Sequence, residues 1–152
     1  MNKKYYLAYG SNLNILDMLI RCPNLKVIGT TILFNYQLVF KGLDNGKAYL
    51  TVEKSEGSYV PLGIYSISSL DERRMDRYEG FLYHKEYIDL NIKNKKVKGL
   101  IYIMNDNYDY YLPSKIYFNK CLEGYKDFGF NQILLSKALN DTVHNIQKGK
   151  AL

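Results

Sequence analysis

The 152-residue sequence has no tryptophan, only two cysteines and two histidines, and no long hydrophobic run. Cys22 and Cys121 share no metal-ligand spacing with His84 or His144, so we predict neither a disulfide framework nor a metal site. Both cysteines are expected to be reduced thiols in the core. No stretch reaches the about 18 apolar residues of a membrane span, and the N-terminus does not resemble a secretory leader. We therefore expect a cytoplasmic protein without a membrane partner.

The length and the 47% hydrophobic content are those of one domain with its own core, so residues 1–152 are expected to form a single domain. The formal charge is +6, with a lysine-rich patch at residues 93–98. Together with sixteen tyrosines, this patch raises the alternative of single-stranded nucleic-acid binding. The lysines, however, lie between two alternating runs at 87–92 and 98–103, which is typical of a solvated hairpin turn. We expect no nucleic-acid partner.

Hydrophobic periodicity predicts a mixture of strands and helices without a regular alternation. Strands dominate the middle of the chain and helices flank it, which argues against a doubly wound parallel sheet and favours the α+β class. Strands are expected near 4–9, 27–40, 47–53, 60–67, 84–92 and 97–104, and helices near 14–21, 70–78, 114–127 and 132–147.

Within residues 6–13, an apolar segment that is predicted to be a strand ends at a corner formed by Gly10, Ser11 and Asn12. Asn12 is suited to cap the helical pattern that follows. A glycine at such a corner allows a ligand to approach the backbone closely, and the next N–H groups can bind an anionic or carbonyl oxygen. The corner therefore predicts a substrate cradle, with an ordinary strand-to-helix turn as the alternative.

A glutamate lies at the end of the helix predicted near 70–78. Residues 69–72 form a capping-box pattern, and Gly80 stands where a C-terminal helix glycine belongs. Glu79 thus falls at a helix C-terminus, where the macrodipole disfavours a carboxylate. Burial beside Tyr78 would raise its pKa in the same direction, toward the range of a general acid and base. The alternative is a solvated glutamate at a helix end.

Three motifs occur in the order and at about the spacing seen in gamma-glutamyl cyclotransferases, and the chain resembles this family. The resemblance covers nearly the whole chain and implies a small mixed β-barrel flanked by helices. The motifs are the Tyr9-Gly10-Ser11-Asn12 corner, the Asp76-x-x-Glu79-Gly80 turn and the Pro113-Ser114-x-x-Tyr117 helix start, and the similarity extends through residues 48–52 and 61–65 to Gly124 and Gly129.

The resemblance implies that the substrate's own alpha-amino nitrogen attacks its gamma-carbonyl, closing 5-oxoproline and releasing an amine. No enzyme nucleophile, cofactor or metal is then expected, and the partner is a small gamma-glutamyl molecule. Glu79 is implied as the general acid and base. The amine released, the oligomeric state and the roles of Tyr78 and Tyr83 stay open, and a non-catalytic module that binds a glutamyl metabolite is the alternative function. The implied substrate-binding residues are Tyr6, Leu7, Ala8, Tyr9, Gly10, Ser11, Asn12 and Tyr117.

Overall fold

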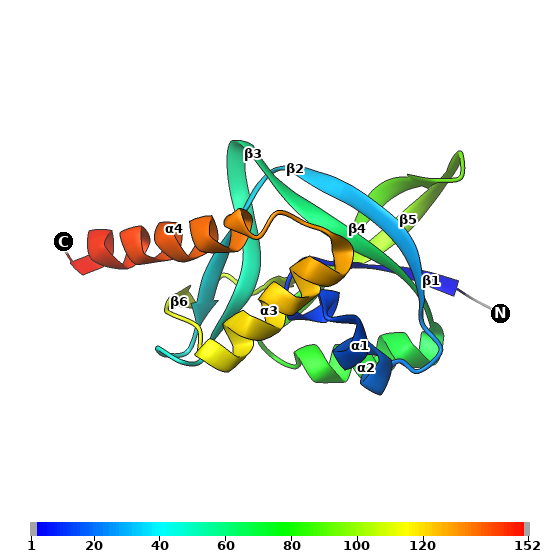
Figure 1. Ribbon diagram of the computed structural model, residues 1–152, viewed down its shortest axis with the longest axis horizontal. Coiled ribbons are helices and arrows are strands. Elements are labelled where there is room, and N and C mark those ends of the chain that lie inside the picture. Colours follow the sequence, from blue (N-terminus) through cyan, green and yellow to red (C-terminus); the bar gives the residue numbers. More distant parts are fainter. Residues whose placement is uncertain (1–2, 151–152) are drawn as a thin grey trace.

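A computed structural model describes residues 3–150, which form one mixed β-sheet with helices packed around it (Figure 1). The predicted helices are present with small shifts at their ends, whereas two of the predicted strands are joined into one and the short β6 was not predicted. The strands are β1 (Lys3–Ala8), β2 (Lys26–Gly42), β3 (Ala48–Ser68), β4 (Tyr83–Ile92), β5 (Lys95–Met104) and β6 (Asp109–Tyr110), and the helices are α1 (Ile15–Arg21), α2 (Ser69–Glu79), α3 (Lys115–Phe128) and α4 (Ile133–Lys150), with a 3-10 turn η1 (Ser11–Leu13) before α1.

The six strands are arranged in the order β4-β5-β1-β3-β2-β6. β1 runs parallel to β5, and every other neighbouring pair is antiparallel. The α+β class is confirmed, but the sheet does not close into the barrel that the resemblance implied. Within residues 3–150, β4 and β6 remain its two edges, because β6 has only two residues and pairs with the end of β2 alone.

β2 and β3 form a long bent hairpin that arches over the helices in Figure 1. The segments predicted near 47–53 and 60–67 are one strand of 21 residues in the structure. They were expected as two because residues 54–59 are polar and contain Gly57. On the neighbouring strand β2, Asn35 has a φ of 64°, and its side chain accepts a hydrogen bond from the Gly57 N–H of β3. The hairpin therefore bends at Asn35 and Gly57, but neither strand ends there.

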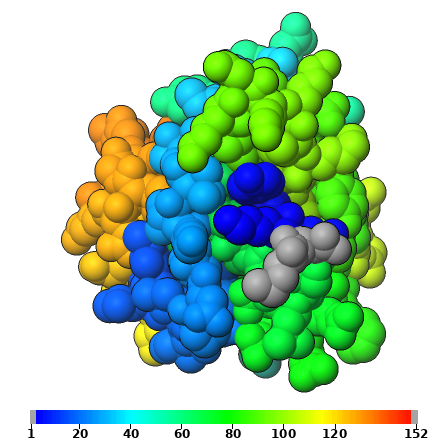
Figure 2. Space-filling view, turned by 90° about the vertical axis from the view of Figure 1, so that its right-hand side faces the viewer, coloured from blue at the N-terminus to red at the C-terminus, as the bar shows by residue number. Residues whose placement is uncertain are grey.

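The two ends of β1 lie in different surroundings. Its first described residues lie on the face shown in Figure 2, between the yellow-green β4–β5 hairpin and the green α2 region. Its other end leads into η1, against which α3 packs. A side chain at Gly124 of α3 would lie 2.7 Å from the Asn14 nitrogen, so only glycine permits this close approach. β1 and α3 thus meet where the predicted corner lies.

Local signals set the helix ends, with one shift. The capping box of α2 uses Ser68 and Asp71, one residue earlier than the predicted 69–72 pattern, because Ser68 is the residue still in an extended conformation. Ser114 caps α3 through a 3.1 Å bond from the Tyr117 N–H. Gly80 ends α2 with a φ of 62°. The positions of Glu79 and Tyr117 therefore follow from caps next to them in the sequence.

The lysine-rich patch is a hairpin turn, as predicted, with Ile92 paired to Lys95 and positive φ angles at Lys93 and Asn94. Cys22 and Cys121 are buried free thiols, and burial raises the pKa of Cys22 to about 11. Among the helices of residues 3–150, none has the length and apolar character needed to cross a membrane.

Candidate active site

A pocket of about 280 Å³ lies where the corner after β1 meets the end of α2 and the start of α3. Its wall is unusually aromatic, since seven of the sixteen tyrosines contribute to it. Glu79 is the only carboxyl group among its lining residues in the described chain. The lining consists of Tyr6, Tyr9, Gly10, Ser11, Asn12, Tyr49, Leu50, Tyr78, Glu79, Leu82, Tyr83, Tyr102 and Tyr117.

The structure brings most of the predicted site residues together. The expected residues that line the pocket are Tyr6, Tyr9, Gly10, Ser11, Asn12, Glu79 and Tyr117.

Leu7 and Ala8 are the exceptions, because neither of them lines the pocket. Both belong to β1 and have at most 1% of their surface exposed, in the hydrophobic core. Successive strand side chains point to opposite faces, so Leu7 faces away from Tyr6 and packs against Gly99. Ala8 is too short to reach beyond the core. These two residues support the corner and do not face the pocket.

The corner uses its carbonyl groups internally and leaves N–H groups free. The oxygens of Tyr9 and Asn12 accept hydrogen bonds from the hydroxyls of Tyr125 (3.2 Å) and Tyr65 (2.7 Å), and those of Gly10 and Ser11 accept from the next residues of the 3-10 turn. In contrast, the N–H groups of residues 10–12 donate no hydrogen bond within residues 3–150. Three neighbouring donors are therefore available beside the pocket for a substrate oxygen.

Asn12 does not cap α1 as expected; Asn14 does, by accepting a bond of 3.1 Å from the Asp17 N–H. The reason is that η1 moves the helix start two residues along the chain. The Asn12 side chain is thereby free to turn to the pocket. Its nitrogen donates to the Tyr6 hydroxyl (2.8 Å) and to Oε1 of Glu79 (3.0 Å), 67 positions away.

Glu79 is the last residue of α2 and is mostly buried. Burial raises its pKa from 4.5 to about 7, although the Asn12 hydrogen bond and the Arg21 charge act in the opposite direction. The C-terminal end of the helix dipole also disfavours the ionised form. Glu79 is thus a carboxyl group that exchanges a proton near neutral pH, as the sequence predicted for a buried helix-end glutamate.

Tyr117 lies in the first turn of α3, opposite the corner. Its hydroxyl oxygen accepts a hydrogen bond from the Leu50 N–H (3.0 Å), and the Cys121 thiol, one helical turn along α3, is a further hydrogen-bonding neighbour of this hydroxyl. The edge of the Tyr49 ring supports the Tyr117 ring, with a centroid distance of 5.1 Å. A Cβ atom at Gly10 would lie 3.5 Å from this hydroxyl, so glycine keeps the gap between them narrow but open.

Hydrogen bonds hold two further tyrosines of the pocket wall in place. The hydroxyl of Tyr83 donates to the Leu50 carbonyl (2.7 Å), and that of Tyr102 donates to Asp76 (2.6 Å). Burial raises the pKa of Tyr6, Tyr83 and Tyr102 above the ordinary phenol value. Burial therefore moves the pKa of these three tyrosines away from neutrality, whereas it moves the pKa of Glu79 to about 7.

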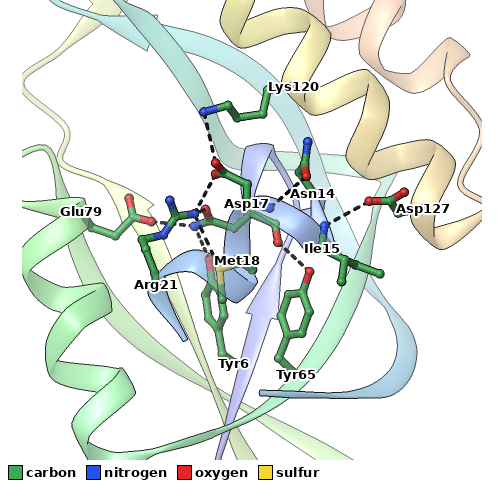
Figure 3. Close-up of polar contacts among 11 residues, drawn as sticks. Tyr6, Asn14, Ile15, Asp17, Met18, Arg21, Tyr65, Glu79, Lys120 and Asp127 are labelled. Atoms are coloured by element: carbon green, nitrogen blue, oxygen red, sulfur yellow. Dashed lines mark hydrogen bonds and ion pairs between the residues drawn. The ribbon is translucent and has the colours of Figure 1, made fainter. Parts of the chain in front are cut away.

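One residue of the site escaped the sequence reasoning. Arg21, at the end of α1, donates to Oδ1 of Asn12 (2.6 Å) and to Asp17 (3.0 Å), and its guanidinium lies 3.8 Å from the Tyr78 ring centroid. Figure 3 shows Arg21 between Glu79 and Asp17, with Lys120 on the far side of Asp17. The i, i+4 spacing of Asp17 and Arg21 signals a helix ion pair, but it does not signal the contact with Asn12.

Within residues 3–150, no three His, Cys, Asp or Glu side chains come together in an arrangement that would hold a metal ion.

Fold and site together define an α+β domain built around one pocket with a single titrating carboxyl group and a turn of free N–H donors. The sequence matches the family described as "Gamma-glutamyl cyclotransferase, AIG2-like" over residues 6–119. The chain belongs to this family, and the resemblance inferred from its motifs is confirmed. No curated protein matches the sequence.

Solved structures share the fold. A protein named gamma-glutamyl cyclotransferase is 21% identical, with a TM-score of 0.74 over 90% of this chain and 86% of its own. The human protein loc79017 is 22% identical, with a TM-score of 0.75 over 91% and 87%. YkqA from Bacillus subtilis is 16% identical, with a TM-score of 0.73 over 93% of this chain and 55% of its own.

Proposed function

We propose that this protein is a gamma-glutamyl cyclotransferase that releases an amine or amino acid from a gamma-glutamyl substrate and forms 5-oxoproline. The observation that carries the proposal is Glu79, a mostly buried carboxyl group with a pKa of about 7 that lines the same pocket as a turn of free N–H groups. A near-neutral carboxyl group can both accept and return a proton at physiological pH.

The first step is removal of a proton from the substrate's alpha-ammonium group. The alpha-amino group of a gamma-glutamyl substrate stands beside a free carboxylate, so its pKa lies above the about 7.7 to 8.0 of a peptide's N-terminal amine. A pKa of about 7 for Glu79 brings the base closer to this group than an ordinary glutamate would. An ordinary exposed glutamate would be a far weaker base. The burial of Glu79 therefore supports this role, and its hydrogen bond from Asn12 keeps the carboxyl group oriented.

Ring closure follows within the substrate. The freed amine nitrogen forms a bond to the gamma-carbonyl carbon, and the carbonyl electron pair moves to the oxygen. The free N–H groups of residues 10–12 and the Tyr117 hydroxyl are the candidate donors to this oxyanion and to the alpha-carboxylate. Collapse of the intermediate breaks the bond to the leaving nitrogen, which takes the proton from Glu79. Glu79 is a carboxylate again at this point, having moved one proton from the alpha-nitrogen to the leaving nitrogen. The ring nitrogen loses its second proton as the lactam forms, and the released amine takes up one proton, so the reaction balances.

Magnitudes indicate where the pocket contributes most. Orienting an intramolecular attack supplies up to about 7 to 11 kcal/mol, whereas a proton-transfer group contributes about 10²- to 10⁴-fold. A flexible glutamyl chain must be folded before its amine meets its carbonyl. A wall of hydrogen-bonded tyrosines is suited to this because it offers fixed surfaces with few rotatable bonds.

The test is a mass-spectrometric screen of gamma-glutamyl amino acids and gamma-glutamyl amines for release of 5-oxoproline. We expect at least one substrate to be converted by the wild-type protein and not by Glu79→Gln. Binding of these compounds without turnover would instead support the alternative of a non-catalytic module for a glutamyl metabolite. Glutamate as the product would place the chain among amidohydrolases and refute the proposal.

A further inference from the structure

Arg21 does not line the pocket, but it contacts two residues that do, Asn12 and Tyr78. We propose that Arg21 is a positioning residue of this site: it holds the Asn12 amide in the one orientation that directs its nitrogen at Glu79. The proposal rests on the role of Glu79 in the proposed function.

The contacts of Asn12 distinguish the two ends of its amide. Oδ1 accepts from Arg21 at 2.6 Å, and Nδ2 donates to Tyr6 at 2.8 Å and to Glu79 at 3.0 Å. A flipped amide would place its oxygen against the carboxylate and its NH₂ group against the guanidinium, and both contacts are repulsive. Arg21 accepts nothing, since a guanidinium has donors only. It therefore fixes which end faces Glu79.

The reaction cycle gives this constraint a purpose. While Glu79 is ionised, the carboxylate itself favours an Asn12 nitrogen beside it. Once Glu79 has taken a proton, its hydroxyl can donate to a flipped Asn12 oxygen, and the proton would then point at Asn12 and away from the leaving amine. The Arg21 guanidinium only donates hydrogen bonds, so it keeps the amide in one orientation in both states of Glu79. The proton on Glu79 remains available to the substrate.

Arg21 is itself held firmly. Asp17 pairs with it at 3.0 Å one helical turn earlier, and the Tyr78 ring lies under its guanidinium at 3.8 Å. Its Nε atom is buried and has no hydrogen-bond partner within residues 3–150. A buried donor without a partner reduces the stability of the folded protein. Arg21 therefore keeps its bond to Asn12 although its Nε–H group stays unpaired within residues 3–150.

Arg21 is also the charged group whose field acts on Glu79. The other titratable groups near it are Tyr6 from β1, Tyr9 after it, Tyr83 from β4 and Tyr102 from β5, and the raised pKa of each keeps it neutral. Loss of Arg21 removes a positive charge and frees the Asn12 amide. Both effects raise the pKa of Glu79, so they do not cancel.

The experiment compares Arg21→Met, Arg21→Lys and the control Lys120→Met. Lys120 lies 3.6 Å from Asp17, so the control removes a positive charge from the same ion-pair network without touching Asn12. The first readout is the pH titration of the Asn12 side-chain NH₂ signals in a ¹⁵N–¹H spectrum, which needs no substrate. The second is the pH profile of kcat/KM for a substrate found in the screen.

In the wild type and in Lys120→Met, we expect the Asn12 signals to follow the ionisation of Glu79. In Arg21→Met, that response is expected to weaken, the midpoint to move to higher pH, and kcat/KM to fall about 10- to 100-fold. Arg21→Lys can still donate to Asn12 and should recover part of the loss, and it serves as the second variant if Arg21→Met is poorly folded.

An unchanged Asn12 titration and unchanged kcat/KM in both Arg21 variants would overturn the proposal. An equal loss in Lys120→Met would overturn it too, because the network charge and not the Asn12 contact would then be responsible. A wild-type protein inactive on every gamma-glutamyl compound would count against the proposed function alone. The spectrum would still report whether Arg21 orients Asn12.

Discussion

Replacing Glu79 with glutamine should make the protein more stable and inactive at the same time. Glutamine has nearly the same shape and can accept the 3.0 Å hydrogen bond from Asn12, but it has no charge to bury and cannot take a proton. Activity should therefore fall by 10²-fold or more, while affinity for the substrate is largely kept. The gain in stability should appear only at a pH where the wild-type carboxyl group is ionised.

The size of this gain follows from the pKa of Glu79, which is about 7 in the folded protein and ordinarily 4.5. The folded state binds more protons than the unfolded state between these two values, so wild-type stability decreases as the pH rises from 4.5 to 7. At 1.36 kcal/mol per pH unit, the full difference is about 3 kcal/mol. For a chain of this length it corresponds to roughly 6 to 12 °C in Tm.

The assay is chemical denaturation of both proteins at pH 4.5 and pH 8, with Glu56→Gln as the control. Glu56 is exposed on β3, so the same substitution there should change the free energy of unfolding by less than about 0.5 kcal/mol at either pH. We expect Glu79→Gln to be the more stable protein at pH 8 and nearly equal to wild type at pH 4.5. A difference that does not change with pH would refute the reasoning, because Glu79 would then carry no desolvated charge.

Three further predictions concern the reaction and the corner. Tyr117→Phe removes a candidate oxyanion donor and should lower kcat about 10²- to 10³-fold; a change confined to KM would assign the hydroxyl to binding alone. Gly124→Ala should destabilise the protein by about 1 to 3 kcal/mol in denaturant titrations, because the added Cβ would lie 2.7 Å from the backbone of residues 13 and 14. A variant as stable as the wild type would contradict the tight packing of α3 on η1. A substrate acetylated on its alpha-amino nitrogen should release no amine, whereas release with N-acetylglutamate as product would indicate hydrolysis by water.

The sequence by itself determined the features that neighbouring residues control. Ser114 and Gly80 set helix ends through bonds to residues at most four positions away, so the places of Tyr117 and Glu79 in their helices were predictable. The hairpin turn at residues 93–94 was predictable for the same reason. A glutamate at a helix end also carries its own electrostatic signal, because the helix dipole acts within one turn.

The tertiary structure alone decided what each side chain of the corner contacts. Asn12 had an equally good local role as a helix cap, and only η1 and the approach of α2 turned it toward Glu79. The contact of Arg21 with Asn12 depends on how α1 folds back on the corner. Whether the sheet closes depends on pairing between strands distant in sequence, and the pKa of Glu79 depends on its burial in the folded chain. Contacts of this kind depend on residues that are far apart in the sequence, so no local pattern in the chain encodes them.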